Sequence, residues 1–244
     1  MSVPDFRQAG HLPKVRGDSG ADARGLPRQR RGITPQMHGR YPDFDCLEQT
    51  GHWDEPTRRV VLDRVDHVPE PAFFTPAETA CLTALCDGVT AQDGEPRIPV
   101  VAFVDQKFAQ GKADGYRYAD MPEDADTWRR VAAGLDEAAA ARGAAAFAEA
   151  GSELRDQIVE AFADGELAGG SWDGLNVERA WSVVIRGVVS AFYSHPWAWN
   201  EIGFGGPAYP RGYAAFGIGL SESWEGLEAF EVDPVSEVRE RGLG

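Results

Sequence analysis

The chain has 244 residues, a hydrophobic fraction of 43%, an aromatic fraction of 10% and a formal net charge of -15. This length and apolar content suffice for a folded core and exclude a wholly disordered protein. The first 40 residues hold eight Lys or Arg against three Asp or Glu, so the acidic excess lies beyond them. Such an acidic body repels nucleic-acid phosphates, which excludes DNA and RNA as expected partners.

Four segments are expected along the chain. Residues 1–40, rich in Gly, Pro and Arg, predict a flexible basic arm. Residues 41–72 mix apolar side chains with prolines, which predicts a docking segment with short turns or one brief helix from Pro56 to about Val65. Residues 73–195 are expected to form a helical core, and residues 196–244 an irregular arm rich in Gly and aromatics that ends in an acidic tail.

Five helices are predicted within the core. The first begins at Thr75-Pro76-Ala77-Glu78, where a capping residue is followed by proline and then by an acid. The next three cover about 99–110, 122–143 and 152–165. The fifth ends at His195-Pro196, and its apolar residues recur at steps of three and four, which predicts one broad buried face. These apolar residues are Val177, Ala180, Trp181, Val184, Ile185, Val188, Val189 and Phe192.

Residues 196–219 have a different character. They contain two Trp, two Phe, two Tyr, six Gly and three Pro, a composition that predicts neither helix nor strand. The rings nevertheless favour burial, so an ordered loop that packs on a surface is expected. The predicted fold class is therefore all-α: a small helical core of about five helices with long irregular N-terminal and C-terminal arms that wrap a partner subunit.

The motifs of catalysis and cofactor binding are not recognised in the sequence. The nearest glycine cluster, Gly203-Phe204-Gly205-Gly206, follows no predicted strand and so does not indicate a dinucleotide site. The five histidines lack metal-ligand spacing. His195 is expected to make a capping or interface hydrogen bond, and Arg186 to pair with a carboxylate or carbonyl, because an isolated guanidinium in an apolar helix is costly.

Membrane, disulfide and export features are also not predicted. No run of 18 apolar residues occurs, so no membrane span is expected. Three cysteines, an odd number without clustering, argue against a disulfide framework, and Cys81 and Cys86 are expected to be small buried apolar residues. A polar segment broken by proline follows Arg30-Arg31, so no twin-arginine signal is predicted. A cytoplasmic location is expected, with the periplasm as the alternative.

Two blocks of sequence carry a resemblance to a known family. The first is Phe73-Phe74-Thr75-Pro76-Ala77-Glu78 with Leu82, Leu85 and Cys86-Asp87. The second comprises FYSHP at 192–196, WNEIGFGGP at 199–207 and YPRGY at 209–213. On these residues, the stretch from Phe73 to Gly217 resembles the gluconate 2-dehydrogenase subunit 3 family.

The resemblance implies a small helical subunit that binds no cofactor and lacks catalytic and metal sites of its own. Its partner would be a large flavoprotein of the glucose–methanol–choline oxidoreductase class, which holds FAD and oxidises a sugar, sugar acid or polyol. In many members a haem-bearing subunit takes the electrons. The small subunit assists folding and stability of the large one, and in many members carries a twin-arginine signal, which is not predicted here.

A partner interface is accordingly expected on the ring-rich arm. The residues predicted to form it are Tyr193, His195, Trp197, Trp199, Asn200, Phe204, Tyr209, Arg211 and Tyr213. Two alternatives remain open from the residues alone: a helical binding or scaffold protein unrelated to redox chemistry, and a stand-alone enzyme that uses His195 and scattered carboxylates.

Overall fold

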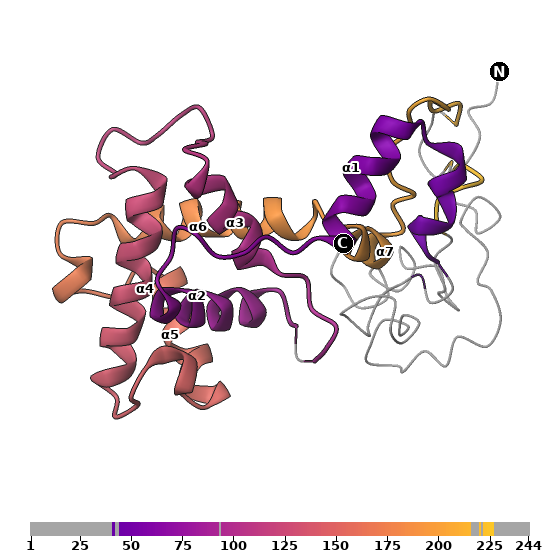
Figure 1. Ribbon diagram of the computed structural model, residues 1–244. Coiled ribbons are helices and arrows are strands. Elements are labelled where there is room, and N and C mark those ends of the chain that lie inside the picture. Colours follow the sequence, from indigo (N-terminus) through magenta and orange to yellow (C-terminus); the bar gives the residue numbers. More distant parts are fainter. Residues whose placement is uncertain (1–40, 42–43, 93, 216–219, 221, 227–244) are drawn as a thin grey trace, which may run out of the picture. The chain divides into compact units, whose positions relative to one another are not determined.

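The computed structural model describes residue 41 and residues 44–92, 94–215, 220 and 222–226 (Figure 1). These residues form seven α-helices and three short 3-10 helices, and no strand occurs among them, which confirms the predicted all-α class. The elements are η2 (Cys46–His52), α1 (Glu55–Asp66), α2 (Pro76–Val89), α3 (Val100–Ala109), α4 (Asp124–Ala140), η3 (Phe147–Glu149), α5 (Ser152–Ala163), η4 (Gly170–Trp172), α6 (Val177–Phe192) and α7 (Pro196–Ile202).

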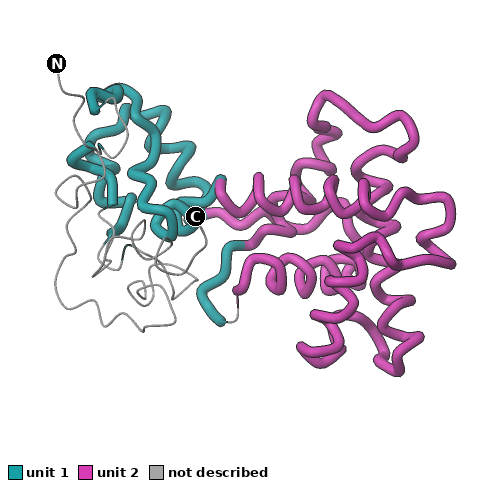
Figure 2. The backbone as a smooth tube through the Cα atoms, turned by 180° about the vertical axis from the view of Figure 1, so that it is seen from behind, with its two compact units in different colours: residues 1–66, 94–98, 194–244 teal, residues 67–93, 99–193 magenta. Residues whose placement is uncertain are grey.

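The chain divides into two compact units (Figure 2). Unit 1 comprises residues 1–66, 94–98 and 194–244, and unit 2 comprises residues 67–93 and 99–193. Helices α2 to α6 all belong to unit 2, so the predicted core of about five helices is confirmed. The brief helix expected from Pro56 to about Val65 is also confirmed, as α1.

Helix α2 begins where its sequence predicts. Thr75 and Glu78 form a capping box, in which each side chain accepts the backbone N–H of the other residue. Just before it, the buried carboxylate of Asp105 on α3 accepts N–H groups of Ala72, Phe73 and Phe74 at 2.7 to 3.1 Å. These bonds fix the entry to α2 against α3, because one buried carboxylate satisfies three successive backbone donors, of which that of Phe74 is buried.

The core of unit 2 is built around large rings and the glycines that admit them. Trp128 of α4 is fully buried, and a Cβ at Gly187 of α6 would lie 2.7 Å from its ring. A Cβ at Gly134 of α4 would lie 2.4 Å from the ring of Trp172 in η4. Both contacts are closer than side-chain carbons approach one another, so glycine is required for α4 to pack against α6 and η4.

Helix α6 buries a narrower face than the sequence predicts. Ala180, Val184, Val188 and Phe192 are buried, as expected, but Val189 is 46% exposed. The expectation that Val189 belongs to the buried face is wrong, because the apolar residues spread over a wider arc than the neighbouring helices cover.

Unit 1 places η2, α1 and α7 around a small apolar cluster of its own. Cys46, Trp53, Val61 and Trp199 are buried in it, and Phe44, Leu47 and Phe204 pack against it. The expectation that residues 196–219 hold no helix is wrong for residues 196–202, which form α7. Pro196 is compatible with a helix there because it stands at the first helical position, where no N–H is needed.

Some sequence-based predictions cannot be compared with the structure. The basic arm over residues 1–40, most of the acidic tail, and the wrapping of a partner by either arm fall outside the described residues. The division into segments at residues 40, 72 and 195 also stays a prediction. None of the helices in the described ranges has the length and apolar character that crossing a bilayer requires.

Candidate partner-binding surface

Buried hydrogen bonds join α7 to η2, about 150 residues apart in sequence. Asn200 Oδ1 accepts the N–H of Cys46 at 2.7 Å, and the Cys46 thiol donates to the carbonyl of Pro196 at 3.3 Å. The amide of Asn200 also donates to Asp45, whose carboxylate caps η2 by accepting the N–H of Leu47. Since Asn200 and Cys46 are fully buried, these bonds fix the start of the glycine-rich segment.

His195 caps the other end of α7. Its Nδ1 accepts the N–H of Trp197 at 3.2 Å, and its side chain is buried. Burial is the main cause that lowers the pKa of His195 to about 4; a hydrogen bond with the backbone of Arg64 opposes the shift, and the charge of Arg64 adds to it. The imidazole is therefore neutral near pH 7, with its proton on Nε2 because Nδ1 accepts.

The glycines after α7 make room for aromatic rings. A Cβ at Gly203 would lie 2.5 Å from the ring of Tyr41, and one at Gly206 would lie 2.4 Å from the ring of Trp53. A Cβ at Gly205 would lie 2.5 Å from Trp224. The cluster at 203–206 thus packs against the protein's own rings, which explains its glycines without a phosphate ligand.

The turn after this cluster is held by Arg211. Its guanidinium lies 4.1 Å from the ring centroid of Trp224 and donates to Gln49 Oε1 at 2.9 Å. Tyr213 also packs against Trp224, and the centroids of the two rings lie 5.0 Å apart. Burial lowers the pKa of Arg211 and raises that of Tyr213 relative to their ordinary values. The turn is therefore ordered by contacts within unit 1.

The nine predicted interface residues fall into three groups by burial. His195, Trp199 and Asn200 are buried inside unit 1, while Trp197, Phe204 and Arg211 are partly buried. Tyr193, Tyr209 and Tyr213 are exposed by 45%, 65% and 42%. Contact of these nine residues with a partner stays a prediction. In the structure, the buried members support the segment that presents Tyr209 and Tyr213.

Two supporting residues escaped the sequence reasoning. Trp224 lies in a stretch expected to be an acidic tail, and Gln49 lies in the docking segment, yet both hold Arg211. The signal available for Trp224 was a lone tryptophan among polar residues, because a ring of that size is seldom left in water. No local pattern points to Gln49, since its partner is 162 residues away.

Several ionisable groups elsewhere in the described residues form structural hydrogen bonds or are buried. Arg186 donates to Asp114 and Asp124 at 3.1 and 3.3 Å, which confirms its expected structural pairing. Its Nη1 also donates to the hydroxyl of Tyr116 at 2.6 Å. Cys81 and Cys86 are buried, as expected, and Cys46 is buried too; all three are free thiols, and burial raises the pKa of each. Thiols with raised pKa values are poor nucleophiles at neutral pH.

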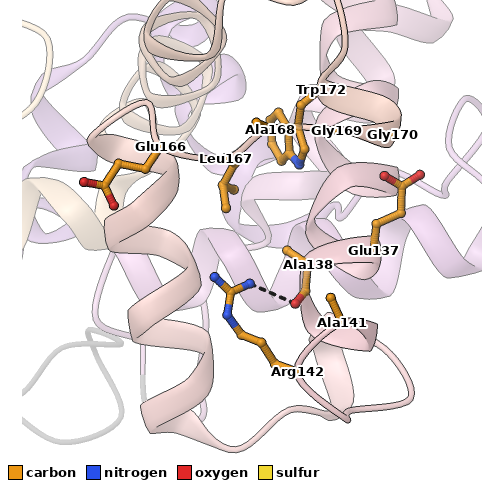
Figure 3. Close-up of a pocket in the computed structure, with 10 residues that line it drawn as sticks. All are labelled: Glu137, Ala138, Ala141, Arg142, Glu166, Leu167, Ala168, Gly169, Gly170 and Trp172. Carbon is orange, nitrogen blue, oxygen red and sulfur yellow. Dashed lines mark hydrogen bonds between the residues drawn. The ribbon is translucent and has the colours of Figure 1, made fainter.

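A pocket of about 410 Å³ lies in unit 2 beside the end of α4 (Figure 3). Leu167 and Trp172 contribute apolar surface to it, and at its edge Arg142 Nη1 donates to the carbonyl of Ala138, one turn earlier in the chain, at 2.9 Å. The carboxylate of Glu137 accepts the N–H and hydroxyl of Ser171 at 2.8 and 2.7 Å, and these bonds lower its pKa. The Glu137 carboxylate of the pocket thus holds η4 against α4.

The described residues define an all-α protein in which buried hydrogen bonds join α7 to η2 and the turn that follows exposes two tyrosines. The model of the family described as gluconate 2-dehydrogenase subunit 3 matches residues 76–206, more than half of the chain. The chain belongs to that family. The match ends before Tyr209, so the turn that holds Tyr209 and Tyr213 lies beyond it. A comparison with curated proteins gave no match, and a comparison with solved structures gave none either.

Proposed function

We propose that this chain is a non-catalytic small subunit of an FAD-dependent sugar or polyol oxidoreductase complex. It binds a large flavoprotein of the glucose–methanol–choline class, assists the folding of that subunit and stabilises it. In this proposal the large subunit holds FAD and this chain binds no cofactor; a haem-bearing subunit, as in many members of the family, is the candidate electron acceptor. Family membership supports the coarse assignment to a dehydrogenase subunit.

The exposure of Tyr209 and Tyr213 on an ordered turn is the observation that carries the proposal. Tyrosines are enriched among the residues that dominate protein–protein affinity. Here the contacts of Arg211 and Tyr213 with Trp224 hold the turn, so the Tyr213 side chain has less conformational entropy to lose on binding. Glycines at 205 and 206 hold the preceding segment close to Trp224 and Trp53. The turn therefore suits a preformed contact with another protein.

His195, the histidine named for the stand-alone enzyme, has a structural role in the fold. His195 accepts a backbone N–H as the cap of α7, and its pKa of about 4 makes it a weak base at neutral pH. The three thiols have raised pKa values because of burial. These observations favour a binding role over a stand-alone enzyme that relies on His195.

Co-purification tests the proposal directly. The tagged chain is co-expressed with a candidate glucose–methanol–choline flavoprotein from the same organism, and flavin absorbance in the eluate is measured together with the yield of folded flavoprotein. We expect a yellow complex, and a lower flavoprotein yield when the chain is omitted. The double variant Tyr209→Ser/Tyr213→Ser should reduce the bound flavin, whereas Tyr118→Ser, a substitution of an exposed tyrosine of unit 2, should not.

Two results would contradict the proposal. If the wild-type chain elutes without flavoprotein under conditions where both proteins are soluble, the flavoprotein is not its partner. Sugar oxidation by the purified chain in the absence of the flavoprotein, lost on His195→Ala, would instead support an enzyme.

A further inference from the structure

Residues 222–226 return to the glycine-rich stretch that follows α7 and pack against it. The N–H of Gly226 donates to the carbonyl of Gly203 at 2.9 Å. Gly226 is buried, and a Cβ at this position would lie 2.8 Å both from the Cα of Gly203 and from the ring of Tyr41. Such contacts are too close for a side chain, so glycine is required at both ends of this backbone contact. The 222–226 segment is therefore seated firmly within unit 1.

Trp224 connects this seat to the turn that carries Tyr213. Its ring lies over Gly205, where an added Cβ would come within 2.5 Å of the indole Cε3. The guanidinium carbon of Arg211 lies 4.1 Å from the ring centroid, and the ring of Tyr213 packs against the same indole with centroids 5.0 Å apart. One side chain thus contacts both the fixed glycine stretch and two residues of the turn.

The backbone on either side of Tyr213 is also anchored. After it, Glu222 Oε1 accepts the N–H groups of Ala214 and Ala215, the latter at 2.6 Å. Before it, Arg211 donates to Gln49 Oε1 at 2.9 Å. Tyr213 itself remains 42% exposed. Its position therefore depends on neighbours that are fixed, while part of its ring is available to another molecule.

The ring of Trp224 also helps to hold Arg211. The Nε atom of Arg211 is buried and makes no hydrogen bond with the residues that the structure describes. A guanidinium partly removed from water is attracted to a ring face more strongly than a fully hydrated one. Without the indole, water would compete for the guanidinium and weaken its hold on the turn.

We infer that Trp224 is a positioning residue for the partner contact: it holds Tyr213 in the orientation in which the large flavoprotein subunit binds it. The inference rests on the proposed function and gives the 222–226 segment a role in binding without direct contact between Trp224 and the partner. A tyrosine that is ordered before binding loses less conformational entropy in the complex. The contacts of Trp224 therefore contribute to affinity through Tyr213.

The test measures the affinity of the full chain for the purified flavoprotein by titration. Trp224→Ala removes the ring, whereas Trp224→Phe retains one that can pack on Arg211 and Tyr213. We expect Trp224→Ala to weaken binding about threefold to tenfold, which is the effect of ordering one large side chain, and Trp224→Phe to restore most of the affinity. Trp181→Ala, a matched loss of a partly buried tryptophan in unit 2, should leave the affinity unchanged.

A double-mutant cycle tests whether Trp224 acts through Tyr213. If it does, Trp224→Ala should cost little further affinity in a chain that already carries Tyr213→Ser. Equal losses in the two backgrounds would mean that Trp224 contributes independently of Tyr213, and the inference would be overturned.

The remaining outcomes separate this inference from the proposed function. If the wild-type chain binds no flavoprotein, the proposed function fails and the inference fails with it. If wild type and Trp224→Ala bind equally well, the proposed function stands and Trp224 has no positioning role.

Circular dichroism and hydrogen exchange in η2 and α7 check that unit 1 of each variant remains folded. Should Trp224→Ala unfold it, Trp224→Leu takes its place, since leucine keeps apolar bulk over Gly205 but offers no ring to Arg211. We expect Trp224→Leu to bind more weakly than Trp224→Phe, and equal affinities of these two variants would contradict the inference.

Discussion

Protonation of His195 is predicted to destabilise unit 1 as the pH falls. The folded-state pKa of about 4 lies below the ordinary value of 6.5, so protons bind the unfolded state more readily. Stability is therefore complete above about pH 6.5 and is lost as the pH falls towards 4. The physical cause is that a protonated Nδ1 cannot accept the N–H of Trp197, and burial disfavours the imidazolium.

The size of the effect follows from the two pKa values. A difference of about 2.5 pKa units corresponds to about 3 kcal/mol once both states are protonated. At pH 5 the unfolded state is largely protonated and the folded state is not, so about 2 kcal/mol is already lost relative to pH 7. A loss of about 2 kcal/mol is a substantial share of the stability of a small folded unit.

Hydrogen-exchange mass spectrometry measures this loss in the two units separately. Peptides from η2 and α7 report unit 1, and peptides from α4 serve as an internal control. The matched variant is His195→Asn, which retains a capping side chain without titrating in this range. We expect the stability difference between wild type and variant to shrink by about 2 kcal/mol from pH 7 to pH 5. Parallel pH profiles for the two proteins, or an NMR titration of His195 near pH 6.5, would refute the reasoning.

Three further predictions concern stability and are checked by urea or thermal unfolding. Asn200→Ala should cost about 2 kcal/mol, because it leaves a buried N–H of η2 without its acceptor. Gly206→Ala should cost about 2 kcal/mol more than Gly212→Ala: both glycines have positive φ, but an added Cβ meets Trp53 only at position 206. Asp105→Ala should cost about 3 kcal/mol, since three backbone donors lose a charged acceptor. Loss below 0.5 kcal/mol in any of these would contradict the corresponding contact.

Local signals predicted the helices well where caps and periodicity agree. The sequence from Thr75 to Glu78 predicts the capping box that starts α2, and the spacing up to Phe192 predicts α6. Helix α7 was not predicted because the glycines and aromatic residues of 196–219 were considered together, although the glycines all lie after residue 202. Pro196 and the six residues after it contain no glycine, and Gly203, with positive φ, ends the helix.

The residue types of the candidate surface could be predicted from the sequence, but which of these residues are exposed and which are buried could not. Exposure of Tyr209 and burial of Asn200 depend on contacts with η2 and Trp224 that are distant in sequence. The position of Val189 on an uncovered side of α6 likewise depends on how far neighbouring helices extend. Apolar periodicity indicates which residues favour burial. Which segment covers them depends on the tertiary structure and cannot be read from local sequence.

The interleaving of the two units along the chain sets an order for folding during synthesis. All segments of unit 2 have been made once residue 193 has left the ribosome, whereas Cys46 in unit 1 still lacks Asn200. The apolar side chains of η2 and α1 therefore lack their packing partner α7 until well over a hundred further codons have been translated. A nascent chain in that state exposes Trp53 and Val61, which makes it a natural client for a chaperone.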